Sequence, residues 1–151
     1  MIIDGYNVIF AWGLDTESLQ DARKSLLDTL DDYAGYSNER ITVVFDGYRT
    51  KKPQLEERHG LVNVVYTSFG VTADTYIQRF VKASDTPVKV VTADYLEQLT
   101  VFWSGAYRLT PAELKSLIYA EREKHIRRLH RSSLDGSALK KRLDIDAVTE
   151  N

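Results

Sequence analysis

Four aspartates adjoin apolar stretches of this sequence, and carboxylates placed in this way can hold a divalent cation. Asp4 ends the stretch MIID, Asp46 ends ITVVFD, and Asp94 ends VKVVTAD. Asp74 lies in VTADTY, where a helical pattern begins. Oxygen ligands suit Mg²⁺ or Mn²⁺ better than zinc, and such an ion supports phosphoryl chemistry. These four aspartates are therefore our candidate catalytic and metal-binding residues.

A structural role competes with metal binding at each of these positions. An aspartate after a strand often caps the helix that follows and interacts favourably with the helix dipole. Four converging carboxylates, however, repel one another, and their pKa values rise unless a cation is present. No Lys or Arg adjoins Asp4, Asp74 or Asp94 in the sequence, so a divalent cation is the simplest partner.

Gly5 and Asn7, which follow Asp4 closely in the sequence, complete the candidate site. We expect Gly5 to let the backbone bend close to a phosphate, and we expect Asn7 to donate a neutral hydrogen bond at the rim of the site.

Strand and helix patterns alternate along the chain. The strand patterns are continuous apolar runs without a polar face, which is typical of a parallel sheet covered by helices on both faces. We expect strands at 1–4, 41–47, 61–68 and 88–94, and helices at 17–34, 72–84, 94–103 and 110–131 with N-caps at Thr16, Thr72 and Thr110.

This pattern predicts a three-layer α/β/α sandwich with a central, mainly parallel sheet. In such folds the ligand crevice lies outside the carboxyl ends of the strands, where the four aspartates would converge. We assign residues 1–131 to one domain and treat 132–151 as a C-terminal tail whose composition allows partial disorder. The charged segment 47–60 is expected to be a long loop.

Composition narrows the functional classes. The 151 residues include no cysteine, which excludes disulfides, thiolate metal sites and a cysteine nucleophile, and is compatible with a reducing, cytoplasmic setting. Neither a leader nor a membrane-spanning stretch is expected. Residues 115–142 hold nine Lys or Arg against three Asp or Glu, a net charge of +6, while the remainder carries −8. This asymmetry suggests a cation-binding body and a segment that meets a polyanion.

The ordered motifs DGYNVI, VVFDGY, TADTYI and VVTADYLEQ resemble the NYN-domain ribonucleases, more narrowly their bacterial YacP-like branch. The resemblance spans residue 1 to about residue 131 and implies a fold related to the PIN nucleases. It further implies a metal-dependent endoribonuclease that associates with the ribosome and cuts mRNA in the A site. The family's acidic residues map onto Asp4, Asp74 and Asp94, with Asp46 as a further acid. Val71 and Gln78 stand where many members carry acidic residues.

Basic and aromatic residues suggest how RNA could be held. The helix end REKHIRRLHR could follow a phosphate backbone or simply be a solvated helix end, and the candidate contacts there are Arg122, Arg127, Arg128 and Arg131. Arg49, Lys51 and Lys52 follow Asp46 and are candidates to grip substrate. Bases could stack on Tyr6, Tyr48 and Tyr95, although tyrosine is also ordinary core material.

Three functions remain open from sequence. The first is a Mg²⁺- or Mn²⁺-dependent endoribonuclease acting on mRNA at the ribosome, with ribosomal RNA as a partner. The second is a PIN-like nuclease acting on free structured RNA or DNA. The third is a non-catalytic ribosome- or RNA-binding module. The oligomeric state is not predicted. A haloacid-dehalogenase-type phosphatase is excluded, because Tyr6 occupies the position of its second aspartate.

Overall fold

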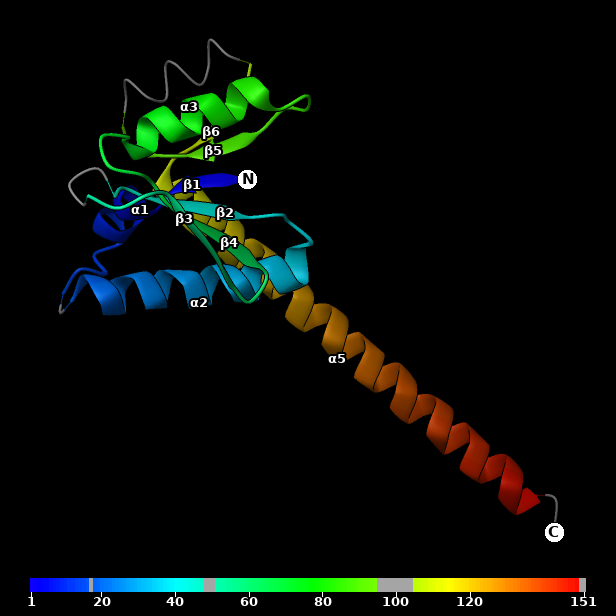
Figure 1. Cartoon of the computed structure of the whole chain (residues 1–151). Helices are drawn as coiled ribbons and strands as arrows, with labels where there is room; N and C mark the ends of the chain where they lie inside the picture. The colour runs from blue at the N-terminus through cyan, green and yellow to red at the C-terminus, as the bar shows by residue number, and fades with distance from the viewer. Residues whose placement is uncertain (17, 48–50, 95–104, 150–151) are drawn as a thin grey trace.

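The centre of the molecule is a six-stranded sheet. The structure, a computed structural model, describes residues 1–16, 18–47, 51–94 and 105–149 (Figure 1). The strand order is β3-β4-β2-β1-β5-β6, and every pair is parallel except β3 with β4. The strands are β1 (Ile2–Asp4), β2 (Thr42–Phe45), β3 (Leu55–His59), β4 (Val62–Tyr66), β5 (Lys89–Val91) and β6 (Tyr107–Leu109).

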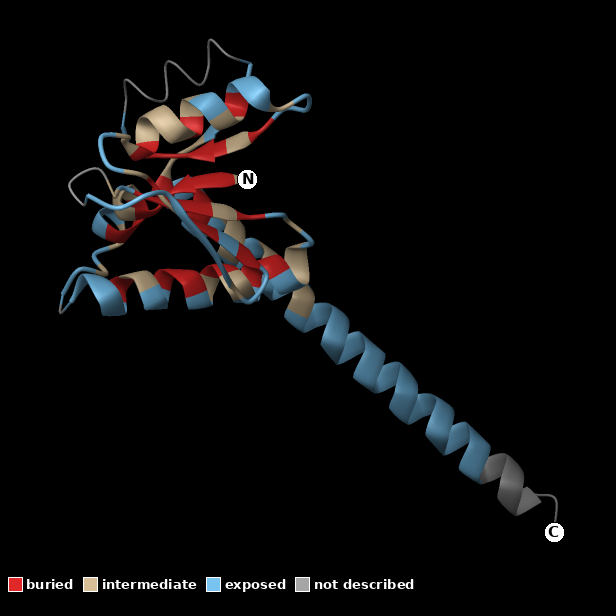
Figure 2. Ribbon diagram, viewed as in Figure 1, coloured by how far each residue is buried: buried red, intermediate tan, exposed pale blue. Residues whose placement is uncertain are grey.

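Helices cover both faces of this sheet. α3 (Ala73–Ala83) lies on one face, while α1 (Gly5–Ala11), α2 (Leu19–Ser37) and the beginning of α5 (Pro111–Thr149) lie on the other (Figure 1). Side chains alternate along β1, so Ile2 packs into the core under α3 and Ile3 into the larger core under α2. Both faces of the central strands are therefore buried (Figure 2), and the predicted three-layer sandwich is confirmed.

Several elements differ from the sequence prediction. β3 lies in the segment expected to be a loop, where its residues are almost all exposed and no apolar pattern marks a strand. α1 and β6 were not predicted, because each spans only a few residues. Ser18, not Thr16, caps α2, and its hydroxyl accepts a hydrogen bond from the Asp21 amide. The helix expected at 94–103 falls outside the described residues, apart from Asp94.

α5 is far longer than expected. It does not end near residue 131 but continues to Thr149, through the segment for which partial disorder was considered. Its first turn is fixed by the predicted capping box, in which Thr110 and Glu113 exchange two hydrogen bonds of 3.1 Å. Every residue from Ile126 to Asp144 is exposed, so the helix leaves the domain as an arm (Figure 2). We call residues 126–149 the α5 arm.

The beginning of α5 is fastened to α1 and α2. The Trp12 indole N–H, just after α1, donates to the Pro111 carbonyl at 2.8 Å. Further along, the ring of His125 stacks on Tyr36 of α2, with centroids 5.4 Å apart. These contacts set the direction in which the arm leaves the body.

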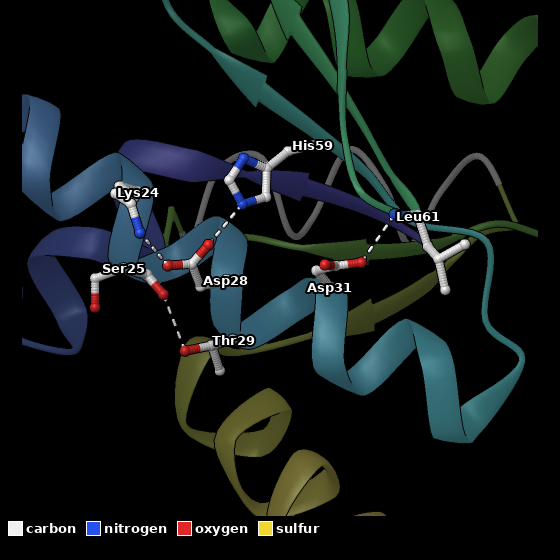
Figure 3. Close-up of polar contacts among 7 residues, drawn as sticks. All are labelled: Lys24, Ser25, Asp28, Thr29, Asp31, His59 and Leu61. Carbon is white, nitrogen blue, oxygen red and sulfur yellow. Dashed lines mark hydrogen bonds and ion pairs between the residues drawn. The ribbon is translucent and has the colours of Figure 1, made fainter.

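Two aspartates of α2 hold the turn between β3 and β4 (Figure 3). The Asp28 carboxylate lies 2.6 Å from His59 Nε2 and 2.7 Å from Lys24 Nζ. One turn later, Asp31 Oδ1 accepts a hydrogen bond of 2.8 Å from the Leu61 amide. These contacts join α2 to the edge of the sheet and so help to fix its position.

We expect Gly60→Ala to destabilise the protein more than Gly13→Ala. Both glycines have positive φ angles, +58° and +66°, so either alanine should cost about 1 kcal/mol of backbone strain. A Cβ at Gly60 would also lie 2.3 Å from the Asp31 carboxylate, whereas nothing lies within 4 Å at Gly13. Displacing Asp31 should roughly double or triple the cost. Urea unfolding of both variants tests this, and equal losses would contradict the contact between the turn and α2.

Candidate active site

All four candidate aspartates line one cleft at the carboxyl ends of the strands. The cleft has a volume of about 720 Å³, and Asp4, Asp46, Asp74 and Asp94 are all in its lining. β1 lies between β2 and β5 in the sheet. The chain runs from β1 to β2 through α1 and α2, and later returns from β4 through α3 to place β5 on the other side of β1. This is the switch point at which open α/β sheets bind ligands.

Asp4 caps a helix and also lines the cleft. Its carboxylate is the N-cap of α1, accepting a hydrogen bond of 3.2 Å from the Asn7 amide. It also lines the cleft, although only 5% of the residue is exposed. Capping uses one carboxylate oxygen, Oδ1, and the other, Oδ2, accepts from the Asn7 side chain at 3.1 Å.

Asn7 joins the two strands that flank the switch point. Its Nδ2 donates to Asp4, while its Oδ1 accepts from the Ala93 amide at 2.9 Å and from the Thr92 hydroxyl at 3.4 Å. Thr92 Oγ1 in turn accepts from the Asp94 amide at 3.1 Å. A continuous set of hydrogen bonds thus connects Asp4 to Asp94. Asn7 is therefore a positioning residue for both acids, while the donor role at the rim stays a prediction.

The two glycines that follow Asp4 and Asp46 serve close packing. A Cβ at Gly5 would lie 2.4 Å from the ring of Phe45, so the expectation that Gly5 frees the backbone for a phosphate is wrong. Gly5 instead allows α1 to lie directly on β2. At Gly47 a Cβ would lie 2.2 Å from the Thr67 carbonyl oxygen, and the Gly47 amide donates to Thr67 Oγ1 at 2.8 Å. This contact holds the chain beyond β2, and hence Asp46, against the end of β4.

Burial makes Asp4 the most perturbed acid of the cleft. Desolvation raises the pKa of Asp4 to about 6, with smaller raising effects from the charges of Asp74 and Asp46. The two hydrogen bonds from Asn7 oppose this rise. A buried carboxylate near two others favours a cation beside it.

The donor set suits a hard cation that keeps much of its hydration. The acids supply only oxygen ligands, as Mg²⁺ and Mn²⁺ prefer. Within the described residues, no three acidic or histidine side chains are grouped closely enough to form a complete metal site. Mg²⁺ is commonly held by one or two carboxylates together with water and substrate phosphate, and the cleft fits this mode.

The other predicted contacts are placed differently. Arg49, Tyr48 and Tyr95 lie outside the described residues. Lys51 and Lys52 are exposed but are not in the described lining of the cleft. Val71 and Gln78, the two positions where the resemblance leads us to expect acids, are both half-buried.

None of the basic residues of α5 is in the described lining of the cleft that holds the four candidate aspartates. Arg122 lines a hollow between α5 and α2, together with Asp31, Asp32 and Tyr36. Arg127, Arg128 and Arg131 are exposed on the α5 arm. The structure thus separates Arg122 from the other three.

Sequence reasoning missed a second wall of the cleft. Phe10 of α1 and Leu19 of α2 line it, and Arg23 lies one turn beyond Leu19 and donates to the Tyr6 hydroxyl at 3.0 Å. Leu19 is the first residue of α2, and 46% of it is exposed. Phe10 could have been found only by recognising α1, which places it one turn after Tyr6.

Comparison with known proteins agrees with this fold. The YacP-like NYN domain family matches residues 1–150. The chain belongs to this family. Over 121 residues it is 34% identical to YacP of Bacillus subtilis (strain 168), covering 76% of this chain and 71% of the relative. The crystal structure of Rae1 (YacP) from the same organism matches with a TM-score of 0.70 at 30% identity, covering 98% of this chain and 89% of that one. A single-substitution mutant of that protein matches with a TM-score of 0.69 at 30% identity, covering 87% and 81%.

Membership of the YacP-like NYN domain family implies a nuclease. The cleft lies where the aspartates of the family-like motifs meet. In the described part of the chain, no helix combines the length and apolar character needed to cross a membrane.

The raised pKa of Asp4 predicts how stability depends on pH. Between about pH 4 and pH 6 the folded chain keeps a proton that the unfolded chain has lost, so the free energy of unfolding should fall as pH rises. The full effect is about 3 kcal/mol. Asp4→Asn should remove this slope. The free energy of unfolding of the variant should therefore rise relative to that of the wild type as the pH increases to about 6.

Urea unfolding in EDTA between pH 4 and 7.5 measures this slope without bound metal. Asp85→Asn, an exposed acid before β5, is the control and should keep the wild-type profile. Parallel profiles for Asp4→Asn and the wild type would contradict a perturbed Asp4.

Proposed function

We propose that this chain is a Mg²⁺- or Mn²⁺-dependent endoribonuclease that hydrolyses phosphodiester bonds of mRNA and acts at the ribosome, in the cytoplasm. The observation that supports it best is the delivery of four carboxylates from four separate elements to one cleft. The YacP-like NYN domain, which implies a nuclease, supports the same reaction class.

The residues of the cleft would have different roles in such a reaction. Asp4, Asp46, Asp74 and Asp94 are the candidates to hold the ion. Asn7 keeps Asp4 and Asp94 in fixed relation, because it binds both sides of the switch point. When bound, a divalent ion supplies neutralisation of phosphate charge and a water of lowered pKa. The burial of Asp4 limits its access to bulk water and strengthens its interaction with a cation.

The α5 arm supports binding to a large polyanion. Lys124 and the arm residues Arg127, Arg128 and Arg131 recur at spacings of three and four, so they form one stripe along the helix. All four are exposed. Basic side chains on a helix that leaves the domain can contact RNA phosphates without blocking the cleft.

Removing one acid should abolish metal-dependent cleavage. We expect Asp4→Asn and Asp74→Asn each to lower the cleavage rate of a short mRNA in Mg²⁺ by about 100-fold or more, because each loses a charged oxygen ligand. Cleavage is measured with and without ribosomes, and with EDTA. Asp85→Asn, with the same chemical change outside the cleft, should cleave like the wild type.

The outcome also separates the competing functions. A non-catalytic RNA-binding module is the second candidate, and the exposed basic stripe of the α5 arm, which can contact RNA without using the cleft, favours it. Wild-type cleavage rates in both cleft variants, or cleavage unaffected by EDTA, would contradict the proposed enzyme. Equal cleavage of free RNA and ribosome-bound mRNA would favour a nuclease that does not need the ribosome.

Charge reversal on the α5 arm should weaken binding to ribosomes and RNA of any sequence. Each phosphate contact with single-stranded nucleic acid contributes about 0.7 to the slope of log affinity against log salt. Arg127→Glu, Arg128→Glu and Arg131→Glu together should therefore flatten this slope by about 2. Co-sedimentation with ribosomes over a salt series measures it.

Two further variants complete this test. Lys82→Glu, exposed at the end of α3, should leave the slope unchanged. Arg122→Glu should lower thermal stability instead, because it adds a negative charge to the hollow that Arg122 shares with Asp31 and Asp32 of α2. An unchanged slope in the triple variant would exclude the α5 arm as the docking surface, and Arg49, Lys51 and Lys52 would be tested next.

A further inference from the structure

Two exposed apolar side chains line the same cleft as the four acids. Phe10 and Leu19 both line the cleft, and 57% and 46% of their surfaces are exposed. Neither side chain is needed to hold a cation, and neither is buried in the core. Large exposed apolar side chains in a cleft that also holds four carboxylates indicate a ligand with an apolar face.

Phe10 stands at the end of a row of aromatic rings. Its ring lies nearly parallel to that of Tyr6, with centroids 6.2 Å apart and an interplanar angle of 23°. Tyr6 packs on the buried Phe45 at 5.1 Å, and Phe45 stacks on Tyr66 at 5.5 Å. Because this row of rings is anchored in the core, Phe10 loses little conformational freedom when a planar group stacks on it.

A cation lies beside the same row of rings. Arg23 is half-buried, and its Nη1 donates to the Tyr6 hydroxyl. A guanidinium group has five N–H donors, so this bond leaves donors for a phosphate oxygen. An aromatic face and an arginine on adjoining elements match the two parts of a nucleotide, the base and the phosphate.

We propose that Tyr6, Phe10, Leu19 and Arg23 form a subsite for one unpaired nucleotide next to the scissile phosphate. The base stacks on Phe10 and contacts Leu19, and the phosphate of that nucleotide binds Arg23. The inference rests on the proposed nuclease function and adds a requirement to it, namely that the substrate is single-stranded at this position. Stacking tolerates any base, so the subsite selects for strandedness and not for sequence.

The test uses a short single-stranded RNA that carries 2-aminopurine at successive positions. Stacking on Phe10 should quench the fluorescence at one position, and annealing a complementary strand should abolish this signal. Phe10→Ala should lose the quenching and weaken binding by about 5- to 100-fold, whereas Phe10→Trp should keep both. Binding is measured in EDTA and again in Mg²⁺ with the Asp74→Asn variant, so that cleavage does not interfere.

Matched variants separate the subsite from a general loss of structure. Tyr107→Ala removes an aromatic side chain that is 63% exposed at the opposite end of the strands and should bind like the wild type. Arg23→Gln, which can still donate to Tyr6, should flatten the salt dependence by about 0.7, and Arg23→Lys should restore it. Thermal unfolding checks that each variant is folded.

The failures of the two proposals are distinguishable. Equal affinity and equal quenching in Phe10→Ala and the wild type, with RNA still bound and cleaved, would overturn the subsite alone. Absence of RNA binding by the wild type would overturn both the subsite and the nuclease function. Equal binding of the single-stranded and the annealed RNA would also overturn the subsite, because a paired base cannot stack on Phe10.

Discussion

The pair of hydrogen bonds between Asp4 and Asn7 is the interaction on which the rest of the cleft depends. It closes the first turn of α1, and through Asn7 Oδ1 it reaches the backbone after β5. Without it, Asp4 and Asp94, which follow the neighbouring strands β1 and β5, would lose the side-chain link that joins them. The bonds also offset part of the desolvation of a carboxylate that is almost fully buried. The same hydrogen bonds thus cap α1 and set the geometry of the site.

The two hydrophobic cores hold in place the strand that carries Asp4. β1 sends Ile2 into one core and Ile3 into the other, so the strand that carries Asp4 is packed from both sides. Gly5 and Gly47 allow α1 and the chain after β2 to approach their neighbours at distances that a side chain would prevent. The side chains of the cleft are therefore attached to backbone that is fixed by packing.

The sequence was sufficient to predict the layers of the fold and the meeting of the acids, because apolar runs and strand-end aspartates are local signals. It was not sufficient for β3, which pairs with β4 through its backbone and carries exposed charged side chains. Nor could it separate Arg122 from Arg127, because only the packing of α5 on α2 decides which side of the helix meets the body. Phe10 and Arg23 were missed for the same reason: their relation to the acids exists only once α1 and α2 are placed.

The length of the α5 arm sets the distance between its far end and the domain. At about 1.5 Å per residue, the 24 residues from 126 to 149 extend roughly 35 Å from the domain. The far end of this rod and the cleft are therefore two points whose separation is set by helix length. Each residue inserted into the rod would lengthen it by about 1.5 Å and turn its far end by about 100°. The helix thus fixes both how far from an anchoring point the cleft lies and in which direction it faces.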